Sequence, residues 1–347
     1  MNDFARALLA WHDVHARDLP WRGETDAYRI WVSEIMLQQT RTETVKGYYE
    51  RFLRAFPTVY ALAAAEEDRV FKLWEGLGYY SRARNLMAAA RQIVDEFGGE
   101  LPADRRQLMR LPGIGEYVSG AVASIAFGLR EPALDGNQAR VLTRVWDYDR
   151  LLRSPAELYD RALEWVPDER PGDYNQALMG LGALVCTPKK PDCGSCPVAA
   201  LCRACENGTQ HLRPVKPEKR AQQIVPVMVA VTYDEAGLVM RKRGKGLLDG
   251  LWEYPNFEGA RTLPDLEAAL QEAGVIAVRT RNLGEHRHGF THRIWQMGGW
   301  AYRLERLEEG GGFRHVSWAE FAQLAVSTAF APYTEYARQL AAKYEKH

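Results

Sequence analysis

The sequence of 347 residues lacks any apolar run near the roughly 18–20 residues that a transmembrane helix requires. Its longest apolar segment, residues 224–233, has only the length of a β-strand. Residues 1–4 show no basic segment leading into an apolar one, as a secretory signal would. We therefore expect a protein without a membrane segment, in a reducing, cytoplasmic setting.

The sequence also lacks net charge, because Lys plus Arg and Asp plus Glu each number 45. This excludes a uniformly basic coat for nucleic acid, although a basic stripe on one face remains compatible with a zero sum. The apolar share is 46%, typical of a globular protein with sizeable cores. A chain of 347 residues is longer than a domain with a single hydrophobic core usually is, so two domains are predicted.

Cysteine is scarce, and all five cysteines lie between Cys186 and Cys205. In a large protein of a reducing compartment, cysteines crowded into one segment indicate metal ligation rather than disulfides. The four candidate ligands are separated by six, two and five residues; they are Cys186, Cys193, Cys196 and Cys202. Four thiolates in a short polar loop suit either a [4Fe–4S] cluster or structural zinc, and spacing alone leaves both open. Cys205 is expected to be a free thiol.

The pattern of apolar residues changes along the chain. Up to residue 206 they recur every three or four positions, which predicts helices. Residues 207–222 contain prolines and basic residues, which is typical of a linker. Beyond them, strands are expected at 224–233, 238–243 and 293–304, and helices at 264–273, after Ser317 and from Pro332. A helical domain followed by an α+β domain is the prediction.

A Pro-Gly turn at residues 111–117 separates two predicted helices. Gly113 and Gly115, on either side of Ile114, let the backbone turn sharply and leave amide N–H groups open at a helix N-terminus. Such a turn can bind a DNA phosphate. The alternative is a plain turn between helices, and the sequence leaves both interpretations open.

Two carboxylates stand out. Glu34 shares a predicted helix face with Ile30, Trp31 and Leu37, so desolvation should raise its pKa and keep it protonated, as a general acid requires. The alternative is a structural glutamate paired with a buried arginine.

Asp135 precedes a predicted helix, and an N-cap position should keep it ionised. Such a pair suits cleavage of a glycosidic bond, but the sequence alone does not bring the two together.

Several motifs together resemble the MutY family of adenine DNA glycosylases, in the helix-hairpin-helix superfamily that includes endonuclease III. They are LPWR at 19–22, SEIMLQQT at 33–40, GLGYY at 76–80, the turn at 111–117, LDGN at 134–137 and the four cysteines. The resemblance covers nearly the whole chain. It implies a [4Fe–4S] cluster rather than zinc. It also implies removal of adenine mispaired with 8-oxoguanine or guanine in double-stranded DNA, by a monomer.

The resemblance also implies the domain boundaries. A helical glycosylase domain would span residues 1–206, with the helix-hairpin-helix at about 105–121 and the iron–sulfur loop at 186–202. A linker at 207–222 would follow, as a candidate contact for other repair proteins. An α+β Nudix-like domain at 223–347 would recognise 8-oxoguanine.

Roles for individual residues follow from the same resemblance. Glu34 would protonate N7 of the flipped adenine, and Asp135 would stabilise the resulting sugar cation, either covalently or by its charge alone. Tyr117 and Asn137 would hold these carboxylates and the attacking water, and Gln176 would help Glu34 engage the base. The pocket wall would comprise Arg17, Trp21, Arg22 and Leu37, and the base opposite the adenine would meet Gln39, Thr40 and Tyr79.

Three residues of the second domain correspond to the family's lesion-reading Phe-Ser-His loop, namely Phe290, Thr291 and His292. Threonine keeps the hydroxyl group of the family's serine and adds a methyl group. Of the glutamates that bind metal in active Nudix enzymes, only Glu272 remains. Recognition without hydrolysis is therefore expected.

Other functions are weighed against these residues. Endonuclease III-like enzymes, which also cleave the strand, carry a lysine where this chain has Tyr117, so a monofunctional glycosylase is predicted. A Nudix phosphohydrolase is opposed by the missing glutamates. A catalytically silent damage-binding protein is opposed by the presence of both Glu34 and Asp135.

Basic residues near the cysteines should face DNA, namely Lys189, Lys190 and Arg203.

Overall fold

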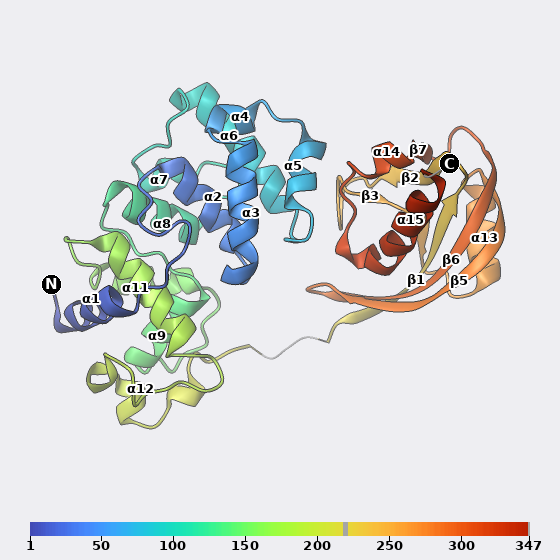
Figure 1. Cartoon of the computed structure of the whole chain (residues 1–347). Helices are drawn as coiled ribbons and strands as arrows, with labels where there is room; N and C mark the ends of the chain where they lie inside the picture. The colour runs from blue at the N-terminus through green and yellow to red at the C-terminus, as the bar shows by residue number, and fades with distance from the viewer. Residues whose placement is uncertain (218–220, 346–347) are drawn as a thin grey trace. The chain divides into compact units, whose positions relative to one another are not determined.

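The computed structural model describes residues 1–217 and 221–345, which form two compact units (Figure 1). The first comprises Met1–Ala65 and Arg84–Lys219, and the second comprises Glu66–Ala83 and Arg220–His347. The boundary near residue 219 falls inside the segment predicted as a linker. Residues 218–220 of that segment, and residues 346–347 of the predicted second domain, lie outside the described residues.

The first unit is helical, as the spacing of apolar residues predicts. Its helices are α1 (Asp3–His15), α2 (Ala27–Leu37), α3 (Thr42–Ala55), α4 (Val59–Ala63), most of α6 (Ser81–Phe97), α7 (Arg105–Leu108), α8 (Glu116–Phe127), α9 (Gly136–Val145), α10 (Tyr159–Leu163), α11 (Pro171–Leu184) and α12 (Arg203–Glu206). Helix α2 packs against α3 and α8, and α11 packs against α1, α8 and α9. This packing brings the starts of α8 and α9 close to α2.

The helices begin where the sequence supplies a cap. Asp26 precedes α2 and accepts a hydrogen bond from the Tyr28 backbone N–H at 2.8 Å. Asp135 does the same for α9, and α11 has Pro171 in its first turn, where its missing N–H costs no hydrogen bond. Local sequence therefore fixes where each of these helices begins.

Part of the segment predicted as a linker is folded against the helical unit. Asp147, after α9, accepts hydrogen bonds from Thr209 Oγ1 at 2.7 Å and Arg213 Nε at 2.8 Å. Val215 forms a β-bridge with Leu151. Composition alone could not show these long-range partners. Thr209, Arg213 and Val215 therefore belong to the helical unit rather than to a linker.

The second unit contains a seven-stranded mixed sheet. Its strands are β1 (Gln223–Tyr233), β2 (Gly237–Lys242), β3 (Trp252–Glu253), β4 (Asn256–Glu258), β5 (Val275–Gly289), β6 (Arg293–Leu307) and β7 (Arg314–Ser317). The order is β3-β2-β1-β6-β5, with β4 paired to β1 and β7 to β2. Strands β1 and β6 run parallel, and the other pairs are antiparallel.

Helices cover both faces of this sheet (Figure 1). They are α13 (Leu263–Glu272) on one face and α15 (Ala331–Tyr344), with the short α14 (Trp318–Phe321), on the other. Val227, Val229 and Val231 pack in the core on the α15 side, whereas Met228 and Ala230 pack in the core that includes α13. The strict alternation along β1 is what a strand buried on both faces requires.

The predicted strands and helices of this unit all form, with ends shifted by a few residues at most. The long strand β5 was not predicted. The segment Glu66–Ala83, expected in the helical domain, groups with this unit, where Lys72 of α5 (Glu67–Trp74) donates to the Leu324 carbonyl at 3.0 Å. Among the helices that the structure describes, none has the length and apolar character to cross a bilayer.

Candidate active site and iron–sulfur loop

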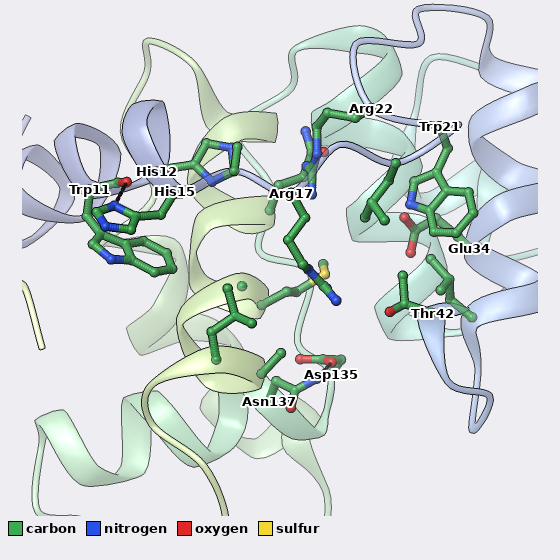
Figure 2. A pocket seen from close by; sticks show the side chains of 18 of the residues that line it. Trp11, His12, His15, Arg17, Trp21, Arg22, Glu34, Thr42, Asp135 and Asn137 are labelled. Carbon is green, nitrogen blue, oxygen red and sulfur yellow. Dashed lines mark hydrogen bonds between the residues drawn. The ribbon is translucent and has the colours of Figure 1, made fainter. Parts of the chain in front are cut away.

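A cavity of about 160 Å³ lies in the helical unit between α1, α2, α8, α9 and α11. Most of the residues predicted to form the site line it, namely Arg17, Trp21, Arg22, Glu34, Leu37, Thr40, Tyr117, Asp135, Asn137 and Gln176. Figure 2 shows Glu34 and Trp21 on one side of this cavity, Asp135 and Asn137 on another, and Arg17 reaching between them. The two carboxylates that the sequence could not bring together therefore open onto one space.

Glu34, on α2, is buried with 5% of its surface exposed. Its Oε2 accepts a hydrogen bond from the Tyr117 hydroxyl group. Burial raises the pKa of Glu34 to about 7, the bond from Tyr117 opposes this, and the nearby Asp135 adds to it. This confirms the expectation from the apolar helix face. A carboxyl group with this pKa holds its proton for much of the time near neutral pH, which suits a general acid.

Asp135 is held by hydrogen bonds at the start of α9. Its Oδ1 accepts from the Gln138 backbone N–H and its Oδ2 from Asn137 Nδ2, both at 2.7 Å. These bonds favour the anion, but burial raises the pKa of Asp135 above its ordinary value. Burial therefore shifts this pKa more than the cap does, which local sequence does not show, and an ionised Asp135 stays a prediction.

Sequence reasoning missed the buried polar residues that support Asp135. Asn175, on α11, is fully buried; its side chain donates to Ser124 Oγ at 2.9 Å and accepts from the Ala133 backbone N–H at 3.0 Å. The Gln138 side chain donates to the Asn175 carbonyl at 3.1 Å. Asn175 stands between Tyr174 and Gln176, before the apolar stretch of α11, so local sequence offered no clear signal. Other unpredicted residues line the cavity, including Trp11, His12, Thr42 and Met179.

The glycine turn before α8 forms as predicted. Gly113 has φ +77°, and a Cβ there would lie 2.7 Å from Asn85 Cβ, so both conformation and space require glycine. Ile114 is buried, and Gly115 is the N-cap of α8. This geometry leaves backbone N–H groups at the start of α8, as the predicted phosphate contact would require.

Two residues predicted to meet the opposite base have unusual backbones. Gln39 and Tyr79 have φ +55° and +49°, a left-handed region that costs energy for residues other than glycine. Both are exposed, and neither is among the residues that line the cavity. Strain of this kind is often found at functional positions, and here it presents two side chains to solvent.

The four predicted cysteine ligands lie in one loop that packs against the helical core. Burial, followed by the neighbouring thiols, raises the pKa of Cys193 and Cys196 to about 11. In residues 1–217 and 221–345, no three Cys, His, Asp or Glu side chains converge as a single metal ion requires. Four thiols close enough to interact, in a loop packed against the helical core, are a donor set that suits a [4Fe–4S] cluster.

Two arginines of α9 bind the loop at its first cysteine. Arg140 donates from Nε to the Cys186 carbonyl at 2.8 Å and from Nη2 to Asn137 Oδ1 at 2.9 Å. Arg144 donates from Nη1 to Cys186 Sγ and to the Cys186 carbonyl, both at 3.2 Å. Lys189, Lys190 and Arg203 are exposed around the loop. The iron–sulfur loop and the cavity therefore share helix α9.

In the second unit, the predicted lesion-reading loop connects β5 to β6. The Phe290 ring packs 4.7 Å from His288 and 4.9 Å from Trp295, measured between ring centroids. Gln222 Nε2 donates to the Phe290 carbonyl at 2.7 Å. Thr291 and His292 are exposed. One side chain therefore anchors the loop, and two face solvent.

The two acidic residues of the predicted Nudix stretch lie on α13. Glu267 pairs with Arg279 at 3.4 Å, and Glu272 is exposed at the end of the helix.

Comparisons with known proteins define the class. Residues 32–168 match the helix-hairpin-helix superfamily of base excision DNA repair proteins, residues 186–202 the iron–sulfur binding domain of endonuclease III, and residues 227–336 the NUDIX domain. The chain is thus an iron–sulfur DNA glycosylase of the helix-hairpin-helix class with a Nudix-like domain.

Its relatives narrow the class further. The adenine DNA glycosylase of Rattus norvegicus is 36% identical over 96% of this chain and 78% of its own length. That of Homo sapiens is 37% identical over 94% of this chain and 72% of its own length. The chain belongs to the adenine DNA glycosylase family.

Solved structures agree on the fold of the helical part. A thermostable thymine-DNA glycosylase superposes with a TM-score of 0.56 at 31% identity, covering 59% of this chain and 95% of its own. Endonuclease III in a non-covalent DNA complex superposes with a TM-score of 0.51 at 23% identity, covering 60% of this chain and 97% of its own. The family carries a [4Fe–4S] cluster, and the four cysteines here fit it.

Proposed function

We infer that this protein binds double-stranded DNA and hydrolyses the N-glycosidic bond of adenine mispaired with 8-oxoguanine or guanine. The observation that carries the inference is the single cavity onto which Glu34 and Asp135 both open. Family membership supports adenine as the base. The proposal of 8-oxoguanine as the partner base depends on the loop at residues 290–292.

The chemistry follows from the two environments. Glu34, with a pKa near 7, donates its proton to N7 of the extrahelical adenine, and the protonated base becomes a good leaving group. Asp135, hydrogen-bonded by Asn137 and Gln138, lies in the same cavity and stabilises the positive charge that develops on the sugar. Its anionic form is required for this step, and the two hydrogen bonds favour that form.

Other cavity residues orient these groups. The Tyr117 hydroxyl group fixes the Glu34 carboxyl, and Gln176 and Arg17 line the space that the base would occupy. Gln39 and Thr40 of the first unit, and Tyr79 of the second, would each contact the opposite base. Unstacking costs a few kcal/mol and is least costly at a mispair, which favours the lesion.

A glycosylase without strand cleavage is the expected form of this activity. Strand cleavage by this class requires an amine that forms a Schiff base with the sugar. Among the described residues that line the cavity there is no lysine, and Tyr117 stands at the corresponding position. A phenol cannot form that intermediate.

Partners and bound groups complete the proposal. The four cysteines would hold the [4Fe–4S] cluster, which ties the loop at 186–202 to α9 and supports DNA binding through Lys189, Lys190 and Arg203. The protein would act as a monomer at DNA. The segment 207–222 would be the first place to seek contacts with other repair proteins.

Single-turnover base release on a panel of duplexes tests the function. Adenine opposite 8-oxoguanine, guanine, cytosine and thymine would be compared, with thymine opposite guanine as a control for another base. The proposal predicts fastest release of adenine opposite 8-oxoguanine, then opposite guanine. Equal rates for every partner, or preferred release of thymine, would contradict it.

A further inference from the structure

We propose that Arg144 is the buried counter-cation of the iron–sulfur cluster and raises the cluster's reduction potential. Arg144 lies on α9 and is 1% exposed. A buried charge is costly unless it meets an opposite charge or a full set of hydrogen bonds. The surroundings of this guanidinium therefore show what the site is built to hold.

The bonds of Arg144 converge on the first cysteine of the loop. Nη1 donates to Cys186 Sγ at 3.2 Å and to the carbonyls of Cys186 and Thr187 at 3.2 and 2.9 Å. Nη2 donates to the Pro188 carbonyl at 3.2 Å, and Nε to the Arg213 carbonyl at 3.2 Å. All but one of these acceptors are neutral carbonyl oxygens. The exception is the sulfur of a cluster ligand.

No carboxylate within the described ranges forms an ion pair with Arg144. The acidic residue that follows α9, Asp147, is engaged by Arg213, Thr209 and Asn207. Arg140, one turn earlier, also faces Cys186, but Asp135 lies close enough to act on its charge as well. Among the hydrogen-bond acceptors of Arg144 in the described ranges, Cys186 Sγ is therefore the one that carries negative charge when it binds the cluster.

This arrangement has a defined electrostatic consequence. Four thiolates outnumber the positive charge of the inorganic core, so the bound cluster is a net anion, and one-electron reduction adds a further negative charge. A fixed cation beside a ligand sulfur stabilises the reduced form more than the oxidised form. Arg144 thus raises the potential, in addition to holding the loop.

The test separates charge from hydrogen bonding with two substitutions in the full-length holoprotein. Arg144→Lys keeps the charge but loses the planar set of donors, whereas Arg144→Gln keeps an amide donor and loses the charge. Cluster occupancy would be followed by visible absorption, and the one-electron potential by voltammetry. Arg54→Gln, which removes an exposed cation at the end of α3 in the same unit, is the control.

The proposal predicts a more negative potential for Arg144→Gln, with Arg144→Lys and Arg54→Gln close to the wild type. It also predicts loss of the cluster to a chelator about 10- to 100-fold faster in Arg144→Gln. Failure of Arg144→Gln to load a cluster that Arg144→Lys retains would also support it. A wild-type potential in Arg144→Gln, or equal shifts or equal cluster loss in both substitutions, would overturn it.

Discussion

In the helical unit Glu34 is buried and bonded by Tyr117 of a neighbouring helix, and Asp135 is partly buried and bonded within its own helix start. The sheet unit instead exposes two of the three residues of its recognition loop. Chemistry in the first unit needs a low-dielectric site that shifts pKa values. Recognition in the second needs side chains that reach a ligand outside the protein. The difference predicts large effects for substitutions in the cavity and modest ones in the loop.

The largest expected effect is loss of the general acid. Glu34→Gln should slow adenine release by about 10²- to 10⁴-fold, because the proton for N7 is no longer supplied. Affinity for the mispaired duplex should change little, since no phosphate contact is removed. Single-turnover kinetics and binding titrations would measure the two. Glu43→Gln, an exposed glutamate on α3, is the control, and near-normal release by Glu34→Gln would exclude the assignment.

Asp135→Asn should slow release by about 10²- to 10³-fold, because the anion that stabilises the sugar cation is lost. Asparagine can still cap α9, so stability should be nearly unchanged. Asp26→Asn makes the same substitution at the N-cap of α2, outside the residues that line the cavity, and should keep full activity. Equal losses in the two variants would indicate a structural rather than a chemical role for Asp135.

The buried acid should also cost stability at high pH. The pKa of folded Glu34 is raised to about 7 from an ordinary 4.5, so the folded state resists deprotonation and its stability falls as pH rises between these values. Glu34→Gln should therefore unfold less readily than wild type at about pH 8, by up to roughly 3 kcal/mol, with a smaller gap at about pH 5. Denaturant unfolding at both pH values measures this, and a gap independent of pH would contradict it.

The smallest expected effect lies in the exposed loop. Thr291→Val removes one hydroxyl group while keeping the shape, and should lower the preference for 8-oxoguanine over guanine by about 2- to 10-fold, the range of one hydrogen bond. Thr291→Ser should keep the preference. The ratio of single-turnover rates on the two duplexes measures it. If Thr291→Val slowed adenine release as much as Glu34→Gln does, the loop would contribute to the chemical step and not only to recognition.

The contrast between the units also explains what could be predicted from sequence. Glu34, Asp135 and the glycine turn have strong local signals in the sequence, namely an apolar helix face, a cap residue and two glycines after a proline. That both carboxyls open onto one cavity depends on the packing of α2 against α8 and of α9 against α11, which no local pattern encodes. The raised pKa of Asp135 escaped prediction for the same reason.

Strand β5 shows the limit in the second unit. Its sequence is rich in Arg, Asn, Glu and His, and only its first residue, Val275, is buried. It is a strand because it pairs along β6, with three register shifts, and not because its own residues alternate. Arg144 and Asn175 illustrate the same point, since their roles depend on carbonyl groups far away in the sequence.

The most direct test of the central claim is the pH dependence of single-turnover adenine release by the wild-type protein. If a protonated Glu34 drives the reaction, the rate should fall as pH rises through about 7, and Tyr117→Phe should move this limb upward, because the hydroxyl group lowers the pKa of Glu34. A rate that stays level from about pH 5 to about pH 9 would contradict the account.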